Sequence, residues 1–114
     1  MSIILHITQR EQWEQAKLVQ SYCSDTLDEG FIHCSTPLQV IKVANSFFAN
    51  QNGLILLCID SDKVRAEIKY EGFDEEHFPH IYGPLNLDAV FKVVDFELGK
   101  DGKFELPQEI IDFT

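Results

Sequence analysis

Leu54-Ile55-Leu56-Leu57-Cys58-Ile59 is a continuous apolar run near the middle of this 114-residue chain. It follows the turn-forming segment Asn50-Gln51-Asn52-Gly53. A short apolar run bounded by turn residues is typical of a strand that is covered on both faces. We therefore expect residues 54–59 to form a strand in the middle of a sheet. The run is far shorter than the roughly 20 residues that a membrane-spanning helix needs.

The segment before this run predicts a helix. Ser35-Thr36-Pro37 supplies hydroxyl groups for an N-cap and a proline suited to the first helical turn. Polar residues then alternate with an apolar face at three- and four-residue spacing. That face consists of Leu38, Val40, Ile41, Val43, Ala44, Phe47 and Phe48. Before the helix, Phe31-Ile32-His33-Cys34 predicts a short strand that follows a turn at Gly30.

The N-terminal segment predicts a strand that leads directly into another helix. Ile3-Ile4-Leu5-His6-Ile7 is mostly β-branched and apolar, and Thr8-Gln9-Arg10-Glu11 has the spacing of a capping box. We expect the helix to run from about Gln9 to Val19. Its buried residues would be Trp13, Ala16 and Leu18, while Glu14 and Lys17 face water.

The segment after the apolar run predicts further strands. Residues 64–71 alternate apolar and charged side chains, which indicates a strand with one wet face at a sheet edge. Pro79 and Pro84 interrupt backbone donation in Gly72–Pro84, so we expect an irregular and functional loop there. Ala89–Leu98 predicts a strand, and a turn at residues 99–102 would let Phe104 pair back as a hairpin.

The order of these elements is an α+β pattern with an antiparallel or mixed sheet. Connections between the later strands are too short for crossover helices, which disfavours a doubly wound nucleotide-binding sheet. The chain contains neither G-x-G-x-x-G nor a P-loop motif. Its length predicts a single domain over residues 1–114.

The chain is strongly acidic, with nine Lys and Arg against nineteen Asp and Glu and a net charge of −10. This sign opposes binding to nucleic acid or to an anionic membrane surface, and we expect neither as a partner. Residues 58–114 carry six basic and fourteen acidic side chains. This excess either keeps a small protein soluble or attracts a cationic partner.

The cysteines and the N-terminus predict a cytoplasmic protein. Cys23, Cys34 and Cys58 are odd in number and form no C-x-x-C motif, which indicates neither a disulfide framework nor a thiolate zinc site. The first residues have no basic segment followed by a long apolar one, as a secretory signal would. Reduced thiols fit this compartment. The sequence leaves the oligomeric state open.

The four histidines fall into two groups. His6 and His33 interrupt the first two predicted strands, and each is either a core residue satisfied by the backbone or part of a site. His77 and His80 lie in the predicted loop, where His77-x-x-His80 with His6 or His33 has the ligand type of a zinc site. Pro79 separates the loop histidines and no helix presents them on one face. We therefore expect no metal site.

The face on which each residue of the second strand projects separates two kinds of chemistry. His33 projects with Phe31 and Ser35, whereas Cys34 projects to the opposite face. This geometry argues against a Cys34–His33 nucleophile pair, and Cys34 is interpreted as a small buried hydrophobe. The chain also lacks the G-x-S-x-G motif of serine hydrolases.

Glu71 and Tyr82 flank the predicted loop and each has two interpretations. Glu71 is either a general base or stabiliser of developing positive charge, or a solvated glutamate at a strand end. Tyr82, next to Gly83-Pro84, either presents its ring and hydroxyl at a pocket mouth or caps the core.

Three segments together carry a resemblance to a known family. Gly30-Phe31-Ile32-His33-Cys34-Ser35-Thr36, with Ile4-Leu5-His6-Ile7-Thr8 upstream and Phe78-Pro79-His80-Ile81-Tyr82-Gly83-Pro84-Leu85 downstream, resembles the domain-of-unknown-function family 952. The resemblance covers nearly the whole chain. The family is biochemically uncharacterised, but its fold is similar to that of the ADP-ribosyltransferases, which bind NAD between two small sheets. It therefore implies an α+β, ADP-ribosyltransferase-like fold with two small, mostly antiparallel sheets and two helices.

The resemblance also implies roles for individual residues. His6, with Thr8 beside it, matches the histidine that holds the NAD ribose. His33, Ser35 and Thr36 would line the nicotinamide side, and the N-terminus of the following helix would offer N–H groups to the pyrophosphate. The residues placed near the reacting centre are Glu71, His80 and Tyr82.

We therefore hypothesise an enzyme that binds a nucleotide of the NAD or ADP-ribose type, with NAD as a substrate and no permanently bound cofactor. Glu71 is the best substitute for the catalytic glutamate of that superfamily, because no glutamate clearly occupies its position. With only Arg10 and Arg65 in the chain, the arginine cluster of the tRNA 2′-phosphotransferases is missing. The alternative is a non-catalytic binding module for a nucleotide, a small metabolite or a basic protein.

Overall fold

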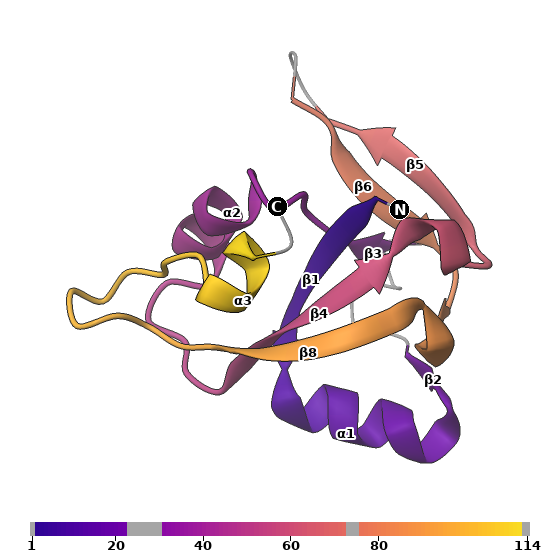
Figure 1. The fold of residues 1–114 in the computed structure, drawn as a ribbon, viewed down its shortest axis with the longest axis horizontal. Coiled ribbons are helices and arrows are strands. Elements are labelled where there is room, and N and C mark those ends of the chain that lie inside the picture. The colour runs from indigo at the N-terminus through magenta and orange to yellow at the C-terminus, as the bar shows by residue number, and fades with distance from the viewer. Residues whose placement is uncertain (1, 23–30, 73–75, 113–114) are drawn as a thin grey trace.

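The structure is a computed structural model that describes residues 2–22, 31–72 and 76–112, and it has an α+β fold (Figure 1). The turn predicted at Gly30 and the thiol of Cys23 lie outside these residues. The helices are α1 (Arg10–Val19), α2 (Val40–Phe47) and α3 (Gln108–Ile111). The strands are β1 (Ile3–Gln9), β2 (Ser21–Tyr22), β3 (Ile32–His33), β4 (Leu54–Asp60), β5 (Glu67–Glu71), β6 (Phe78–Tyr82), β7 (Leu85–Asn86) and β8 (Val90–Phe96).

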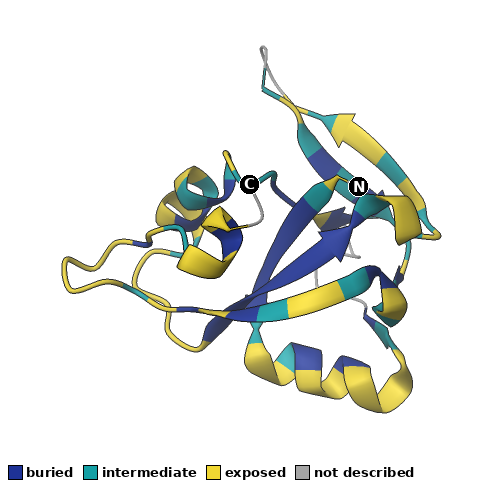
Figure 2. Ribbon diagram, viewed as in Figure 1, coloured by how far each residue is buried: buried dark blue, intermediate teal, exposed yellow. Residues whose placement is uncertain are grey.

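The sheet with the longest strands is antiparallel and has the strand order β1-β4-β8. Every residue of β4 is buried, as the dark blue central strand in Figure 2 shows. Continuous burial is possible because other structure covers both faces of this strand. The prediction of a central strand at residues 54–59 is confirmed.

Two smaller sheets, also antiparallel, complete the described strands. One has the order β3-β6-β5 and the other pairs β2 with β7. The α+β antiparallel class is therefore confirmed, and β5 lies at a sheet edge as predicted. Two sheets and two helices were expected, whereas the described residues form three sheets and three α-helices. The additional elements, α3 and the β2–β7 pair, consist of very few residues and leave no periodic signal.

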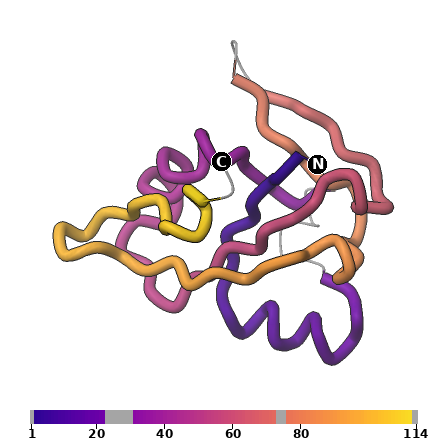
Figure 3. The backbone as a smooth tube through the Cα atoms, viewed as in Figure 1, coloured from indigo at the N-terminus to yellow at the C-terminus, as the bar shows by residue number. Residues whose placement is uncertain are grey.

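Two hydrophobic clusters lie on opposite faces of the β1-β4-β8 sheet. The alternate residues Ile55, Leu57 and Ile59 of β4 join the first cluster, together with α1 and the β3-β6-β5 sheet. The intervening residues Leu54 and Leu56 join the second cluster, together with α2 and α3. Figure 3 shows the chain after β8 turning back toward α2, which closes this second side.

The segment Gly72–Pro84 contains a strand where we expected an irregular loop. Residues 78–82 form β6, the central strand of its sheet, despite Pro79. The carbonyl of Pro79 accepts a hydrogen bond from Cys34 N at 3.0 Å. In an extended strand the nitrogen and carbonyl of one residue point to the same side, so the missing N–H of Pro79 faces the end of β3. The ladder to β5 therefore loses no donor.

Helix positions agree with the predictions better than helix faces do. Trp13, Ala16, Val40 and Ala44 are buried. Three apolar residues predicted on the buried faces are exposed: Leu18 by 78%, Leu38 by 97% and Phe47 by 75%. These residues lie at the helix ends or, for Leu38, before α2 begins, where the opposing sheet no longer reaches them.

Two local predictions were wrong. Thr8 does not cap α1, because its hydroxyl bonds the Gln12 side chain at 2.6 Å and the N-cap is Gln9, without a side-chain bond. Residues 99–102 form the predicted turn, but Phe104 belongs to no strand. Its ring stacks on Phe96 at 4.7 Å and its N–H donates to Asn45 Oδ1 at 2.9 Å.

No helix among residues 2–22, 31–72 and 76–112 is long and apolar enough to cross a membrane.

Candidate functional site

The face of the β3-β6-β5 sheet that points away from the first hydrophobic cluster carries polar and aromatic side chains. Strand alternation turns Ile32, Ile68 and Ile81 toward the cluster, and their neighbours turn outward. His33 lies opposite His80, and Lys69 lies opposite His80 on the other side. The Glu71 cluster is defined here as Phe31, His33, Glu71, His80 and Tyr82.

Glu71 lies at the centre of this cluster because two side chains donate to one of its oxygens. The Tyr82 hydroxyl donates to Glu71 Oε1 at 2.5 Å, and His80 Nδ1 lies 3.0 Å from the same oxygen. These bonds, that of Tyr82 first, lower the pKa of the Glu71 carboxyl. The second oxygen, Oε2, has no hydrogen-bond partner among the described residues, and the side chain is 43% exposed. Glu71 thus presents an ionised oxygen to solvent.

Aromatic rings pack against the two side chains that bond this carboxylate. Phe31 stacks on His80 with ring centroids 4.2 Å apart, and it meets His33 edge-on at 4.7 Å. Its ring centroid lies 5.2 Å from that of Tyr82. The ammonium of Lys69 lies 4.8 Å from the Tyr82 ring centroid, within the range of a cation–π contact. The rings hold His80 and Tyr82 in the positions from which they donate to Glu71.

The predicted residues Glu71, His80 and Tyr82 therefore come together, as their placement near one centre requires. Their assembly depends on β6, which brings His80 and Tyr82 onto the face of β5 that carries Glu71. Phe31 was not among the predicted site residues. Its alternation with His33 was visible in the sequence, but its stacking on His80 depends on the β3–β6 pairing.

A second group of polar side chains, the His6 chain, runs from a partly buried residue of α1 to the backbone of this site. It consists of His6, Thr8, Gln12 and Tyr22. His6 Nδ1 lies 2.5 Å from the His33 carbonyl oxygen, and His6 Nε2 lies 2.9 Å from the Tyr22 hydroxyl. The Tyr22 hydroxyl lies 2.7 Å from Thr8 Oγ1, which lies 2.6 Å from the Gln12 side-chain oxygen.

His6 is 5% exposed, and both of its ring nitrogens have partners within the protein. Burial lowers the pKa of His6 from 6.5 to about 4, so the ring is neutral at pH 7. Sequence reasoning found His6 and Thr8 but not Gln12 or Tyr22. Tyr22 belongs to a two-residue strand, and no periodic pattern could have placed it beside His6.

Ser35 and Thr36 lie where β3 meets the turn before α2. Ser35 is buried and exchanges backbone hydrogen bonds with Leu5, at 2.8 Å for its N–H and 2.7 Å for its carbonyl. The Thr36 N–H donates to Gln39 Oε1 at 3.0 Å, the reciprocal half of a capping box. These two backbone N–H groups are thus engaged within the protein, and the helix assigned to residues 40–47 begins later than Ser35-Thr36-Pro37 suggested.

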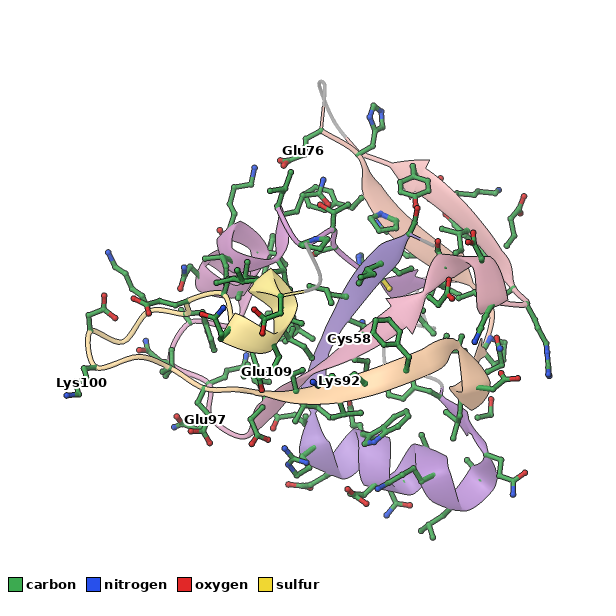
Figure 4. All side chains as sticks on the ribbon, in the orientation of Figure 1. Cys58, Glu76, Lys92, Glu97, Lys100 and Glu109 are labelled. Atoms are coloured by element: carbon green, nitrogen blue, oxygen red, sulfur yellow. The ribbon has the colours of Figure 1, made fainter. Side chains whose placement is uncertain are left out.

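The cysteines described by the structure take no part in the site. Burial raises the pKa of the Cys34 thiol strongly, and it raises that of Cys58 to about 11. Cys58 lies on β4, and Lys92 on β8 and Glu109 at α3 lie near it in the view of Figure 4. Thiols of this kind are unreactive at neutral pH. Within the described part of the chain, no group of three or more His, Cys, Asp or Glu is arranged to hold a metal ion.

A shallow surface groove lies apart from the Glu71 cluster, between α1 and β8. Arg10, Trp13 and Lys17 of α1 and Val93 and Asp95 of β8 are among the residues that line it. Arg10 and Asp95 form an ion pair across it. The groove is therefore bridged by its own charges.

A family model described as "Protein of unknown function (DUF952)" matches residues 7–93. The X-ray structure of protein CC0527 from Caulobacter crescentus is similar with a TM-score of 0.87 and 29% identity, covering 96% of this chain and 99% of that chain. The solution NMR structure of CC0527 has a TM-score of 0.80 and 30% identity, with 96% and 97% coverage. No curated protein matches this chain. The similar structures share the fold over nearly their whole length, and their descriptions assign no activity.

Proposed function

Because the chain belongs to the family of proteins of unknown function DUF952, whose description assigns no activity, we propose a function from the geometry of the Glu71 cluster. The chain binds a nicotinamide-type nucleotide such as NAD on the outward face of β3, β6 and β5. Glu71 then stabilises the positive charge that develops as the nicotinamide leaves. The ADP-ribosyltransferase-like fold, which first implied NAD as a substrate, stays a prediction.

The observation that carries the proposal is the Glu71 carboxylate, which has one oxygen hydrogen-bonded within the protein and the other exposed to solvent. Tyr82 and His80 fix Oε1 and keep the carboxyl ionised, while Oε2 has no partner among the described residues. A fixed negative charge stabilises a developing cation more than a mobile one does, because it needs no reorganisation during the reaction. A ribose hydroxyl is also a suitable donor to a carboxylate oxygen.

The aromatic rings support the choice of a ligand that carries a planar ring. The ring centroid of Phe31 lies between 4.2 and 5.2 Å from those of His80, His33 and Tyr82. The ring centroids of His33 and His80 are 5.2 Å apart. Planar heterocycles stack on such surfaces, and a positively charged ring such as the nicotinamide of NAD is attracted to the face of a tyrosine or phenylalanine. Glu71 adds a negative charge beside that surface.

In the proposed step, the bond between ribose C1′ and the nicotinamide nitrogen breaks. The electron pair of this bond leaves with nicotinamide, which becomes neutral, and positive charge appears on C1′ and the ring oxygen of the ribose. Glu71 Oε2 faces this charge. The hydroxyl of an acceptor or of water then attacks C1′ and releases its proton to solvent.

Thermal unfolding with NAD, ADP-ribose and nicotinamide tests the binding. A ligand at a hundredfold excess over its Kd stabilises the folded state by about 2.7 kcal/mol, which raises the Tm of the wild-type chain measurably. We expect Glu71→Gln, which removes the charge and keeps the shape, to abolish the NAD-dependent rise. The matched control is Glu67→Gln on the same face of β5, which should keep it. A wild-type chain that none of the three compounds stabilises contradicts the proposal.

A binding module without turnover is the second candidate function. It is favoured by the exposure of the site, because Glu71 is 43% exposed and enzymes commonly exclude water from a reacting cation. Release of nicotinamide from NAD, followed by chromatography, separates the two candidates. Turnover that stops in Glu71→Gln supports the enzyme, whereas binding without release supports the module.

A further inference from the structure

The His6 chain joins the interior of the protein to the main chain of a site residue. It runs from Gln12 on α1 through Thr8 and His6 on β1 and Tyr22 on β2 to the carbonyl of His33 on β3. Each of its four links is between 2.5 and 2.9 Å long. His6, Thr8 and Tyr22 are buried. Such a chain needs a consistent order of donors and acceptors from one end to the other.

The carbonyl of His33 determines that order, because a carbonyl oxygen only accepts. His6 Nδ1 must therefore carry a proton. In the neutral ring Nε2 then holds a lone pair, so the Tyr22 hydroxyl donates to it. Tyr22 has a single proton, and its oxygen must accept from the Thr8 hydroxyl.

The donor in the bond between Thr8 and Gln12 depends on whether the His6 ring is neutral or charged. In the structure the Tyr22 hydroxyl donates to Thr8, and the Thr8 hydroxyl donates to the Gln12 oxygen. With that order Nε2 must also carry a proton, which fits only the imidazolium. With a neutral ring the Gln12 amide is turned by 180° and its nitrogen donates to Thr8. Burial of His6 favours the neutral order, which runs from Gln12 through Thr8, Tyr22 and His6 to His33.

We infer that His6 is a positioning residue, which orients His33 through the peptide carbonyl and does not itself contact ligand. The inference rests on the proposed function only in placing the ligand at the Glu71 cluster. β3 has two residues, so its ladder to β6 contains few hydrogen bonds. The bond from His6 Nδ1 and the Leu5–Ser35 bridge supply the further contacts that hold this short strand. The ring of His33 is thereby kept against His80 and Phe31.

Two substitutions of His6 separate a positioning role from direct contact. The amide nitrogen of Asn occupies the place of Nδ1, whereas that of Gln occupies the place of Nε2. We expect His6→Asn to keep the NAD affinity within about threefold and His6→Gln to weaken it about tenfold or more, because only Asn can still donate to the buried His33 carbonyl. The opposite ranking would show that Nε2 reaches the ligand and would overturn the inference.

Tyr22→Phe is the second variant, since it leaves His6 intact if the His6 variants fail to fold. It removes the donor to Nε2 but keeps the bond from Nδ1 to His33, so NAD affinity should stay within about threefold of wild type. Tighter NAD binding would mean that the released Nε2 engages the ligand, against the inference. Tyr70→Phe, which removes an exposed hydroxyl on β5, is the matched control.

NMR of the wild-type chain tests the inference without any nucleotide. The ¹⁵N shifts of the His6 ring should show the Nδ1–H tautomer at pH 7, and the His33 ring signals should move in His6→Gln but not in His6→Asn. An Nε2–H tautomer, or equal movement in both variants, overturns the inference. If NAD does not bind, the proposed function fails while these ring signals still decide the role of His6.

Discussion

Single side chains account for most of the chemistry that this chain can offer. Glu71 has one carboxylate oxygen hydrogen-bonded and the other exposed to solvent, whereas both ring nitrogens of His6 have hydrogen-bond partners inside the protein. Both residues were expected in a site from the sequence, yet they differ in access to solvent. The difference arises from strand alternation, because Glu71 projects outward from β5 and His6 projects into the first hydrophobic cluster.

The bond from Tyr82 to Glu71 predicts a measurable change in titration. Tyr82→Phe removes the largest contribution to the lowered pKa of the Glu71 carboxyl, so this pKa should rise toward its ordinary value. NMR titration of the side-chain carboxyl carbon measures it. Tyr70→Phe, on the opposite face of β5, should leave the titration unchanged. An unchanged Glu71 titration in Tyr82→Phe would mean that the hydrogen bond is not formed in solution.

The lowered pKa of His6 predicts a dependence of stability on pH. The pKa is 6.5 in the unfolded chain and about 4 in the folded one, so between these values the unfolded state binds more protons. The stabilising contribution is present above pH 6.5 and is lost as the pH falls through about 4. It amounts to about 3 kcal/mol. The ionisable side chains nearest the ring are those of Tyr22 and His33.

Urea unfolding of the wild-type chain and of His6→Asn between pH 7.5 and pH 4 measures this contribution. The free energy of unfolding of the wild type should fall more steeply than that of the variant, since Asn binds no proton. His77→Asn, which replaces an exposed histidine, is the matched control. Parallel curves for wild type and His6→Asn would show that the ring is already accessible to protons in the folded state.

Among the elements, those with a strong periodic signal were predictable and those with few residues were not. The apolar run of β4, the helical spacing of α1 and α2 and the strand at β8 agree with the predictions within one to four residues. β6 was missed because Pro79 signals a break, and the direction of its missing N–H is visible only once β3 is beside it. Tyr22 was also missed because its strand, β2, is recognisable only from its pairing with β7.

The candidate site was predictable to the extent that it depends on alternation along single strands. Glu71, His80 and Tyr82 were assigned to one centre from the sequence and the family resemblance. What the sequence does not contain is the register between strands, which decides that Phe31 stacks on His80 and that Tyr82 reaches Glu71. The bond from the Thr36 N–H to Gln39 Oε1 likewise depends on a side-chain rotamer of Gln39.

The hairpin of β5 and β6 predicts the effect of a single methyl group. A Cβ at Gly72 would lie 2.1 Å from the backbone oxygen of Glu76, which no rotamer change relieves. We expect Gly72→Ala to displace the hairpin and to destabilise the fold by about 1–3 kcal/mol. Gly99→Ala is the comparison, because its Cβ would lie 3.1 Å from the Lys103 oxygen in an exposed turn. Equal Tm values for both variants would contradict this expectation.

Taken as a whole, the molecule has two hydrophobic clusters that share the β1-β4-β8 sheet between them. The Glu71 cluster rests on the first through Ile32, Ile68 and Ile81, while α2 and α3 belong to the second. Figure 4 shows Glu76 near the free end of the β5–β6 hairpin, and its pairing with Lys42 of α2 joins the two sides. Gln39 Nε2 adds a bond to the His77 carbonyl at 2.8 Å.

This arrangement predicts which large side chains matter for stability. Leu57 is fully buried in β4, and Leu57→Ala should lower the free energy of unfolding by about 2–5 kcal/mol. Phe47 is 75% exposed at the end of α2, and Phe47→Ala should change it by no more than about 0.5 kcal/mol. Chemical denaturation of both variants measures the contrast. Similar losses would mean that Phe47 is covered in solution.

The alternation of β4 between the two clusters has a practical consequence for protein engineering. A designer who wants a more heat-resistant variant can refill the side around Phe96 and Phe104 while every residue beneath the outward face of β3, β6 and β5 keeps its neighbours. A library that varies ligand preference can in turn be confined to that outward face. A shift of β4 by one residue would turn its side chains from each hydrophobic cluster to the other. Insertions and deletions in this strand should therefore be avoided, whether stability or ligand preference is being engineered.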